Sequence, residues 1–354
     1  MSRTRVVDVG GVKIGGDNPV VVQSMTNTPT DDVEKTLAQI AGLVERGCEL
    51  VRVAVPDSDA GKRLPEIVSG SPVPVIADIH YSPELAFTAL DAGVDKLRLN
   101  PGNITDPEAI GEIAREAKSL SIPIRVGVNS GSLDKNILED YGRTPEGMVV
   151  SAEKEIELLE REGFRDIVVS LKSSDVNRTI RANETFAEKY DYPLHLGVTE
   201  AGGGRSGLVK SSIGIGTLLQ EGIGATIRVS LTADPREEVV TAYDILGSLG
   251  IRNRGVDIIS CPTCGRTEID VETIGRELEE RLSDLENSLS LALMGCSVNG
   301  IGEADSADLG VVGTARGGVL YVNGEQEELI PSTSTAEVVK RLEKRIRSYL
   351  EKGD

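Results

Sequence analysis

The sequence predicts an α/β protein in which a (β/α)8 TIM barrel is followed by a small α+β iron-sulfur domain. Eight short apolar, β-branched segments recur in the first part of the chain, and most are separated by segments with helical spacing. After Arg252 this alternation ends and a different order of elements begins. A doubly wound sheet is the alternative, but such sheets usually contain fewer strands. We therefore expect a barrel in residues 1–252 and a second domain in residues 253–354.

The expected elements of the barrel follow from the spacing of apolar residues. Its strands are predicted at residues 20–23, 50–55, 73–79, 96–99, 124–128, 166–170, 194–198 and 226–230. Helical spacing predicts helices at residues 31–45, 83–91, 107–119, 152–162 and 175–190. In the second domain we expect strands at 256–259, 289–294, 310–314 and 318–322, and helices at 270–282 and 335–350.

Composition excludes several classes of protein. The 354 residues are 39% hydrophobic, which is enough for two cores, and 57 acidic against 38 basic residues give a net charge of -19. Such a charge, with no Trp and 3% aromatic residues, argues against nucleic acid and anionic membrane surfaces as partners. No segment has the apolar length of a signal peptide or a membrane span, so we expect a cytoplasmic protein.

Three cysteines and one glutamate near the C-terminus form the most specific pattern. They are Cys261 and Cys264 in SCPTCGR, and Cys296 and Glu303 in MGCSVNGIGE. Both segments follow apolar stretches, so the thiols are expected where strands end and turns begin. Glycines around them are expected to form a loop whose amides approach an anionic cluster. Thiolates combined with one harder carboxylate favour a metal centre for redox or Lewis-acid chemistry.

A structural zinc site is the alternative interpretation, because C-x-x-C is common in zinc ribbons. A ribbon would normally add a second C-x-x-C or a histidine, and neither follows Cys296. A disulfide is disfavoured, since nothing in the sequence indicates an oxidising compartment. Cys48 lies in an apolar approach to a strand, where we expect it to be a buried small hydrophobic residue.

Several predicted barrel strands place a basic residue between apolar neighbours. Because side chains alternate along a strand, the neighbours should pack under the helices while the basic residues point into the lumen. They are Arg52, Arg98, Arg125, Lys172 and Arg228. Internal pairing with Asp78, His80 and Glu200 at strand ends is one explanation. Five cations against so few carboxylates favour a bound polyanion, and the Gly-rich segment 201–207 before Lys210 adds a phosphate-type feature at a predicted helix start.

Taken together, the motifs resemble a known family. The stretches VVVQSMTNTPTDD, ELVRVAVPD, PVIADIHY, DKLRLNPGNI, IRVGVNSGSL, VSLKSSD, LGVTEAGG, IRVSLTADP, SCPTCGR and MGCSVNGIGEAD span both expected domains. The chain resembles the bacterial 4-hydroxy-3-methylbut-2-enyl diphosphate synthases, the iron-sulfur enzymes of the non-mevalonate isoprenoid pathway. One departure is Ile301, which stands where the family pattern has proline and could alter the predicted loop that carries Glu303.

The resemblance implies a function and a cofactor. The implied substrate is 2-C-methyl-D-erythritol 2,4-cyclodiphosphate, expected to bind at the barrel mouth and to be opened reductively to (E)-4-hydroxy-3-methylbut-2-enyl diphosphate. The resemblance also implies that reduced flavodoxin or ferredoxin supplies two electrons through a 4Fe-4S cluster on Cys261, Cys264, Cys296 and Glu303. The resemblance also implies a head-to-tail homodimer in which one subunit's cluster domain covers the partner's barrel.

Roles for the barrel residues follow from this combination. Candidates for diphosphate contacts are Arg52, Arg98, Arg125, Lys172, Lys210 and Arg228, with Asn100, Asn129 and Ser230 as hydrogen-bonding neighbours. Glu200 is the candidate proton donor, and Asp78 and His80 are expected to orient substrate or relay protons. Two rival functions remain: a phosphate- or pterin-binding barrel transferase with a structural zinc domain, and a non-catalytic iron-sulfur scaffold.

Overall fold

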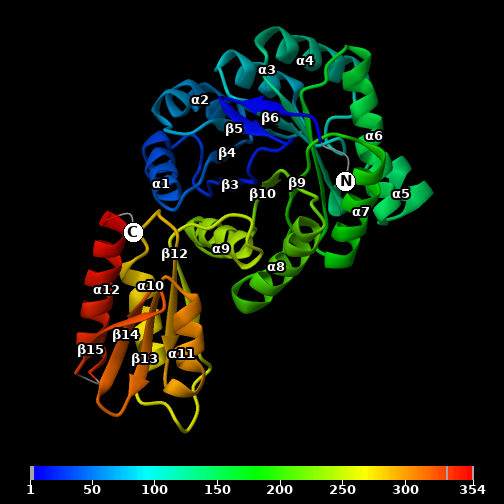
Figure 1. Ribbon diagram of the computed structural model, residues 1–354. Coiled ribbons are helices and arrows are strands. Elements are labelled where there is room, and N and C mark those ends of the chain that lie inside the picture. Colours follow the sequence, from blue (N-terminus) through cyan, green and yellow to red (C-terminus); the bar gives the residue numbers. More distant parts are fainter. Residues whose placement is uncertain (1–3, 332–333, 353–354) are drawn as a thin grey trace. The chain divides into compact units, whose positions relative to one another are not determined.

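The computed structural model describes residues 4–331 and 334–352. The chain divides into two compact units, residues 1–252 and residues 253–354, and each unit has its own hydrophobic core (Figure 1). The elements of each unit are described separately below.

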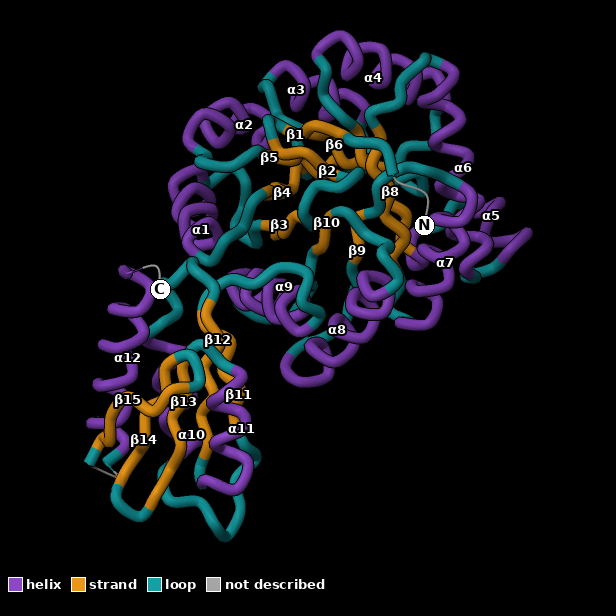
Figure 2. Tube along the Cα trace, in the orientation of Figure 1, coloured by secondary structure: helices purple, strands orange, loops and turns teal. Residues whose placement is uncertain are grey.

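The first unit is a closed parallel barrel, as the sequence predicts. Its eight strands pair in the order β8-β7-β6-β5-β4-β3-β10-β9, and a bridge between Val169 and Leu194 joins β8 to β9. In Figure 2 the strands lie inside a ring of helices. The strands are β3 (Val21–Met25), β4 (Leu50–Val55), β5 (Val75–Ile79), β6 (Lys96–Leu99), β7 (Ile124–Asn129), β8 (Ile167–Lys172), β9 (His195–Leu196) and β10 (Thr226–Ile227).

Helices cover the outside of this barrel, and aspartates begin several of them. The side chains of Asp32, Asp57, Asp106 and Asp175 each accept a hydrogen bond from a backbone N–H of the first helical turn. The helices are α1 (Val33–Glu45), α2 (Ser58–Gly70), α3 (Pro83–Asp91), α4 (Pro107–Leu120), α5 (Lys135–Tyr141), α6 (Pro145–Arg161), α7 (Val176–Lys189), α8 (Gly204–Gln220) and α9 (Pro235–Ser248), with a 3-10 turn at Ser130–Ser132.

A short hairpin closes the end of the lumen at which the barrel strands begin, and we call this the lower end. The opposite end, where the strands finish, is the upper end. The sequence analysis did not predict this hairpin. Its antiparallel strands are β1 (Val7–Val9) and β2 (Val12–Ile14). Their apolar side chains pack with inward-facing residues of the barrel strands in a separate core layer: Val7, Val9, Ile14, Val21, Leu50, Ile76, Val168 and Ala225. Strands of three residues are too short to give a period of two.

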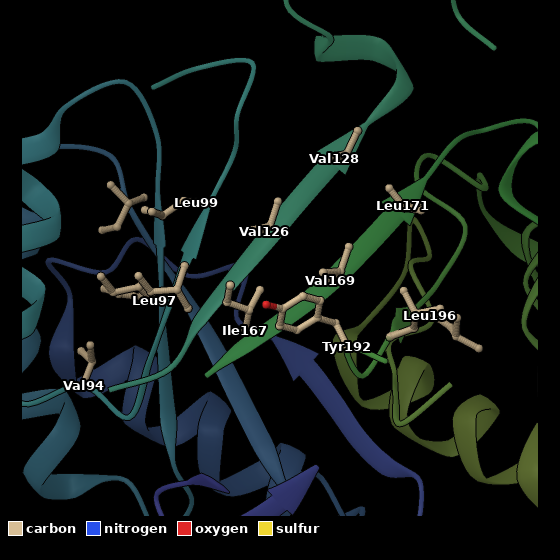
Figure 3. Close-up of a cluster of buried hydrophobic side chains, with 14 of the residues drawn as sticks. Val94, Leu97, Leu99, Val126, Val128, Ile167, Val169, Leu171, Tyr192 and Leu196 are labelled. Atoms are coloured by element: carbon tan, nitrogen blue, oxygen red, sulfur yellow. The ribbon is translucent and has the colours of Figure 1, made fainter. Parts of the chain in front are cut away.

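Alternation along each barrel strand separates an apolar outer face from a polar inner one. Leu97, Val126 and Val169 belong to the large core between strands and helices (Figure 3). Their neighbours Lys96, Arg98 and Arg125 are also buried, and they lie on the opposite face of the same strands. The fold thus confines charged side chains to the upper lumen, above the apolar layer of the hairpin.

The second unit is an α+β domain around one mixed five-stranded sheet. The strands lie in the order β11-β12-β13-β14-β15. Strands β11, β12 and β13 are parallel to one another, and β14 runs antiparallel to both of its neighbours, β13 and β15. They are β11 (Val256–Ser260), β12 (Leu289–Met294), β13 (Leu309–Thr314), β14 (Gly317–Val322) and β15 (Glu325–Ile330). The helices are α10 (Val271–Arg281), α11 (Ser297–Ser306) and α12 (Thr335–Lys352).

Two elements of this unit were missed by the sequence analysis. Strand β15 reads EQEELI, and its first five residues are exposed, so it lacks the apolar alternation of a half-buried strand. Helix α11 contains two glycines, which made its sequence resemble a loop.

The buried state expected for Cys48 in the first unit is confirmed: it is 2% exposed, and burial raises the pKa of its thiol to about 12. Among the described residues, no helix is both long and apolar enough to cross a membrane.

Candidate active site and metal ligands

Six basic side chains gather in the upper lumen of the barrel, and we call them the basic cluster. Five were predicted from the strand pattern, and the sixth is Lys96. The members are Arg52, Lys96, Arg98, Arg125, Lys172 and Arg228. Five of them are less than 10% exposed, and Arg228 is partly buried. Arg98 and Arg125 pair in register on adjacent strands, and Arg52 and Arg98 both contact Asp78, so these groups lie near one another.

Asp78 neutralises part of this charge. Its carboxylate lies 3.0 Å from Arg98 and 3.7 Å from Arg52, and it is only 5% exposed. Burial alone would raise its pKa, but Arg52 and Arg98 outweigh that effect and hold the pKa well below its usual range. Asp78 therefore stays ionised and fixes two of the basic side chains.

His80 and Met25 complete the contacts of these two arginines. Arg98 lies 2.9 Å from Nε2 of His80, and because an arginine only donates, this nitrogen accepts the hydrogen bond. The other ring nitrogen of His80 lies 2.8 Å from the side-chain amide of Asn103. Arg52 donates to the sulfur of Met25 at 3.0 Å, and burial lowers the pKa of Arg52 to about 10 although Asp78 acts in the opposite direction.

Glu238 neutralises Arg228, and the sequence analysis missed it. Its carboxylate lies 3.3 Å from Arg228 and also accepts the backbone N–H of Leu231 at 2.9 Å. Glu238 belongs to the first turn of α9, where an acidic residue is ordinary, so its sequence position carried no signal. The sequence did contain a signal for Lys96, because it lies two residues before Arg98 and therefore on the same face of the strand.

The remaining members of the cluster have no carboxylate partner within the described parts of the chain. These members are Lys96, Arg125 and Lys172. Nζ of Lys96 is buried without a hydrogen-bond partner among the described residues. The same holds for two nitrogens of Arg125, Nε and one terminal nitrogen. Burial, followed by neighbouring basic groups, lowers the pKa values of all three well below normal. Six basic groups face two carboxylates, so internal pairing explains only half of the cluster. The excess positive charge suits an anionic ligand.

Two glycines create the space that the long basic side chains need. A Cβ atom at Gly127 would lie 2.4 Å from Nε of Arg98, and one at Gly197 would lie 2.6 Å from Nζ of Lys172. Each glycine directly follows an outward-facing residue, Val126 or Leu196, and so takes an inward-facing position itself; its missing side chain leaves room in the lumen. The sequence analysis did not assign these glycines a role.

We expect Gly127→Ala to reduce kcat/KM by roughly 10- to 100-fold, because the new methyl group displaces an arginine fixed at both ends. Arg98 donates to Asp78 on one side and to the carbonyl of Gly127 at 3.1 Å on the other. Steady-state kinetics and thermal unfolding measure the effect. Gly216→Ala is the control, since a Cβ there meets nothing within 4 Å. A Gly127→Ala enzyme with unchanged kinetics would contradict the proposed position of Arg98.

Asn129 is the last residue of β7, and Asn100, Glu200 and Ser230 lie on segments that follow β6, β9 and β10. The amide of Asn100 bonds the hydroxyl of Ser132 at 3.0 Å, and Asn129 pairs in register with Lys172. Glu200 is exposed and has a left-handed backbone with φ of 52°. For a residue other than glycine this conformation is strained, which is typical of functional segments. Within the described residues, no hydrogen bond or ion pair joins the side chains of Glu200 or Ser230 to the basic cluster.

Lys210 does not lie at a helix start, contrary to the prediction. Helix α8 begins at Gly204, within the Gly-rich segment, so Lys210 is its seventh residue and is half-buried. The glycines were interpreted as a loop, whereas four of the seven residues from 201 to 207 are helical. Lys210 therefore has no access to the free N–H groups of the first helical turn.

The four predicted metal ligands come from neighbouring elements of the second unit. Cys261 directly follows β11, Cys296 lies two residues after the end of β12, and these two strands pair in parallel. The backbone N–H of Gly295 donates to the sulfur of Cys261 at 3.2 Å, which places Cys261 beside the residue that precedes Cys296. Cys261 and Cys296 are partly exposed, and Cys264 is exposed. Their donors are therefore accessible at one end of the sheet.

The predicted loop that carries Glu303 is instead helix α11. Cys296 is the N-terminal cap residue of this helix, and Glu303 lies seven residues later, on the same side two turns along. The glycines at 300 and 302 are helical rather than part of a loop, and Ile301 is a helical residue that is 54% exposed. A buried side chain at 300 is excluded, because a Cβ there would lie 2.7 Å from Val312.

No three His, Cys, Asp or Glu side chains within residues 4–331 and 334–352 lie close enough to bind one metal ion. A four-iron cluster makes a different demand, since each protein ligand binds a separate iron. Soft, accessible cysteine sulfurs near the ends of adjacent strands, one of them accepting a backbone N–H, fit that demand. Cys261, Cys264, Cys296 and Glu303 are the residues that could hold such a group.

Comparison with known families decides the classification. A family model described as the GcpE TIM-barrel domain matches residues 4–243, and one described as the GcpE protein C-terminal domain matches residues 257–348. The chain belongs to the GcpE family. This finding confirms the resemblance inferred from the motifs and favours it over a transferase with a zinc domain.

Relatives of this GcpE chain are similar along nearly its whole length. A Persephonella marina protein named 4-hydroxy-3-methylbut-2-en-1-yl diphosphate synthase (flavodoxin) is 54% identical over 324 residues, which cover 91% of this chain and 92% of the relative. A protein of the same name from Aquifex aeolicus is 51% identical over 352 residues, with 99% and 98% covered.

Solved structures show the same barrel fold at much lower identity. The dihydropteroate synthase of Yersinia pestis matches with a TM-score of 0.51 and 11% identity, covering 69% of this chain and 98% of that one. The Stenotrophomonas maltophilia dihydropteroate synthase gives a TM-score of 0.50 and 15% identity, with 69% and 99% covered. At such identities the similarity concerns the fold alone.

Proposed function

We propose that this GcpE chain catalyses the reductive ring opening and dehydroxylation of 2-C-methyl-D-erythritol 2,4-cyclodiphosphate. The product is (E)-4-hydroxy-3-methylbut-2-enyl diphosphate. Family membership and the names of relatives about half identical to this chain support the reaction. The structural observation that carries the proposal is the basic cluster, whose positive charge exceeds that of its two carboxylates.

The basic cluster suits a cyclic diphosphate. Arginine side chains bind phosphate oxygens through paired N–H donors, and buried donors without partners gain most from such a ligand. Arg125 and Lys172 lack a carboxylate among the described residues, so we assign them the central contacts. Arg52, Arg98 and Arg228 are held in place by Asp78 and Glu238 and add further donors. Asn100, Asn129, Lys210 and Ser230 are proposed as outer contacts.

The reaction needs a proton as well as electrons. Two electrons enter the substrate, one C–O bond to phosphate breaks and opens the ring, a hydroxyl group leaves as water, and a carbon–carbon double bond forms. The departing hydroxyl must gain a proton. We assign its donation to Glu200, an exposed carboxylic acid on the segment after β9, where catalytic groups of barrels gather. Asp78 and His80 are proposed to orient the substrate through Arg98.

We assign a 4Fe-4S cluster to Cys261, Cys264, Cys296 and Glu303. When bound, such a cluster supplies the electrons of the reaction one at a time. The backbone N–H of Gly295 and the partly exposed sulfurs support this assignment from the side of the protein. The relatives' names specify flavodoxin, and we propose reduced flavodoxin as the electron donor of this chain, with ferredoxin as the alternative.

We further propose a head-to-tail homodimer in which the ligands of one subunit serve the barrel of its partner. Its support is the resemblance to the family, together with the placement of the two sets of residues in different units of the chain. A shared site requires that two chains with different defects restore one another's activity.

Anaerobic purification followed by metal and sulfide analysis and an activity assay tests the function. We expect a coloured protein with about four irons per chain that converts the cyclodiphosphate when reduced methyl viologen is supplied. A colourless zinc protein would exclude the proposal in favour of a transferase with a structural zinc domain. A coloured protein that leaves the cyclodiphosphate unchanged would identify a scaffold instead.

A further inference from the structure

Lys96 and His195 lie deep in the lumen. Lys96 is a member of the basic cluster, but neither residue has so far been assigned a contact or a catalytic role of its own. Lys96 is fully buried on β6, and His195 is 1% exposed on β9. Lys96 has the strand parity of Arg98 and pairs in register with Ile76, a member of the apolar layer that closes the lower lumen. These two residues therefore lie below the rest of the basic cluster. We call Lys96 and His195 together the floor of the lumen.

One side-chain nitrogen of each residue has no hydrogen-bond partner among the described residues. Nζ of Lys96 and Nε2 of His195 are buried without a hydrogen bond, while Nδ1 of His195 lies 2.6 Å from the hydroxyl of Thr226. A buried donor or acceptor without a partner costs free energy, so the presence of one such atom on β6 and another on β9 calls for an explanation.

Basic side chains of the surrounding strands exert the largest electrostatic effects on these two groups. Arg125 on β7 and Arg52 on β4 face Lys96, and His195 is faced in addition by Lys172 on β8 and by Lys96 itself. The two carboxylates of the upper lumen, Asp78 on β5 and Glu238 on α9, form their ion pairs with Arg52, Arg98 and Arg228. Among the described residues, neither Lys96 nor His195 forms an ion pair with a carboxylate.

We propose that Lys96 is a positioning residue for the anionic substrate and takes up a proton when the diphosphate enters the basic cluster, with His195 assisting beside it. This inference rests on the proposed function. In the empty barrel, burial and the neighbouring cations disfavour the charged forms of both groups. Two phosphates bring negative charge into the same space and reverse that preference.

Lysine is the residue type that suits this task. Arginine keeps its proton under all ordinary conditions, whereas a buried lysine or histidine changes its charge readily. A floor of lysine and histidine can thus remain uncharged while the barrel is empty and become positive when the ligand arrives. The proton on Lys96 then draws the diphosphate toward the lower lumen and fixes its depth relative to Glu200.

Calorimetric titration of the full-length holoenzyme tests the proposal. The cyclodiphosphate, and inorganic pyrophosphate as a second probe, are added at pH 8 in buffers with different heats of ionisation. We expect wild type to take up protons with both ligands, and Lys96→Met to take up fewer and to bind roughly 10- to 100-fold more weakly. In kinetics KM should rise while kcat changes much less.

Two further measurements separate positioning from a purely structural role. Methionine replaces the lysine at similar volume without a buried amine, so Lys96→Met should unfold at the same temperature as wild type or above it. His195→Asn keeps a polar group near Thr226 and removes Nε2, and it should lower proton uptake while the barrel remains folded.

The outcomes that would overturn the inference are specific. Pyrophosphate binding by wild type without proton uptake would do so, as would identical uptake by wild type and Lys96→Met. If pyrophosphate binds with proton uptake but the cyclodiphosphate does not bind, the proposed function fails and the role of the floor in anion binding survives. If neither ligand binds, both proposals fail.

Discussion

Asp78→Asn is expected to lower the free energy of unfolding by roughly 3 to 5 kcal/mol and to remove most activity. The wild-type carboxylate neutralises Arg98 at 3.0 Å and Arg52 at 3.7 Å, in a region that already contains three basic groups without a carboxylate among the described residues. Asparagine retains the shape but leaves both arginines buried without a counter-ion. Denaturant unfolding and steady-state kinetics measure the two effects.

The pH dependence provides an independent check on this prediction. The pKa of Asp78 is lower in the folded protein than in the unfolded chain, so its stabilisation is fully present above the unfolded value of about 3.9. That stabilisation is lost as the pH falls below this value toward the folded-state pKa. The difference in stability between wild type and Asp78→Asn should therefore be constant near neutral pH and shrink below about pH 4.

Asp91→Asn is the matched control, because Asp91 is exposed on α3 and should tolerate the same substitution. Pyrophosphate supplies a second test. A bound anion replaces part of the missing negative charge, so it should stabilise Asp78→Asn more than it stabilises wild type. Equal stability of Asp78→Asn and wild type without any anion would show that the carboxylate does not neutralise the cluster.

Cys261→Ala is expected to lose the visible absorption of the iron-sulfur cluster and to reduce activity to background. The sulfur of Cys261 accepts the backbone N–H of Gly295, the residue before Cys296, so the substitution removes one of the four proposed ligands next to another. Absorption spectra and iron analysis of anaerobically purified protein measure the loss. Cys48→Ala is the matched control, because Cys48 is buried in the barrel core and should leave iron content unchanged.

Mixing two inactive chains tests the shared site. Cys261→Ala retains its barrel and Glu200→Ala retains its metal ligands, so a mixed head-to-tail dimer contains one complete site. Random exchange of subunits should restore about a quarter of wild-type activity. If both variants fold and exchange subunits but the mixture remains inactive, the head-to-tail arrangement is wrong.

The barrel could be predicted from the sequence because its strands and helices have regular periods. The predicted strand at 50–55 agrees with β4 to the residue, as the one at 96–99 does with β6. The same alternation placed Arg52, Arg98 and Arg125 on the inner face of their strands. Short or polar elements escaped prediction, as β15 and the hairpin of β1 and β2 show.

Helix α11 shows where local composition misleads. Its glycines made residues 297–306 resemble a loop, and helix propensity alone favours that interpretation. Packing decides otherwise: Gly300 lies against Val312 and Met294, where a larger side chain would collide. Gly300 permits the helix to approach the sheet, whereas the sequence analysis assigned it to a loop that approaches a ligand.

The sequence by itself determined the fold class, the family and the basic residues that enter the lumen at Arg52, Arg98 and Arg125, because strand parity and motif spacing are local properties. Only the tertiary structure decided which charges cancel. Glu238 neutralises Arg228 from a helix ten residues further along the chain, and Asp78 joins Arg52 to Arg98 across three strands. The free energy of a buried charge depends on its neighbours in space, and these are fixed only when the barrel closes.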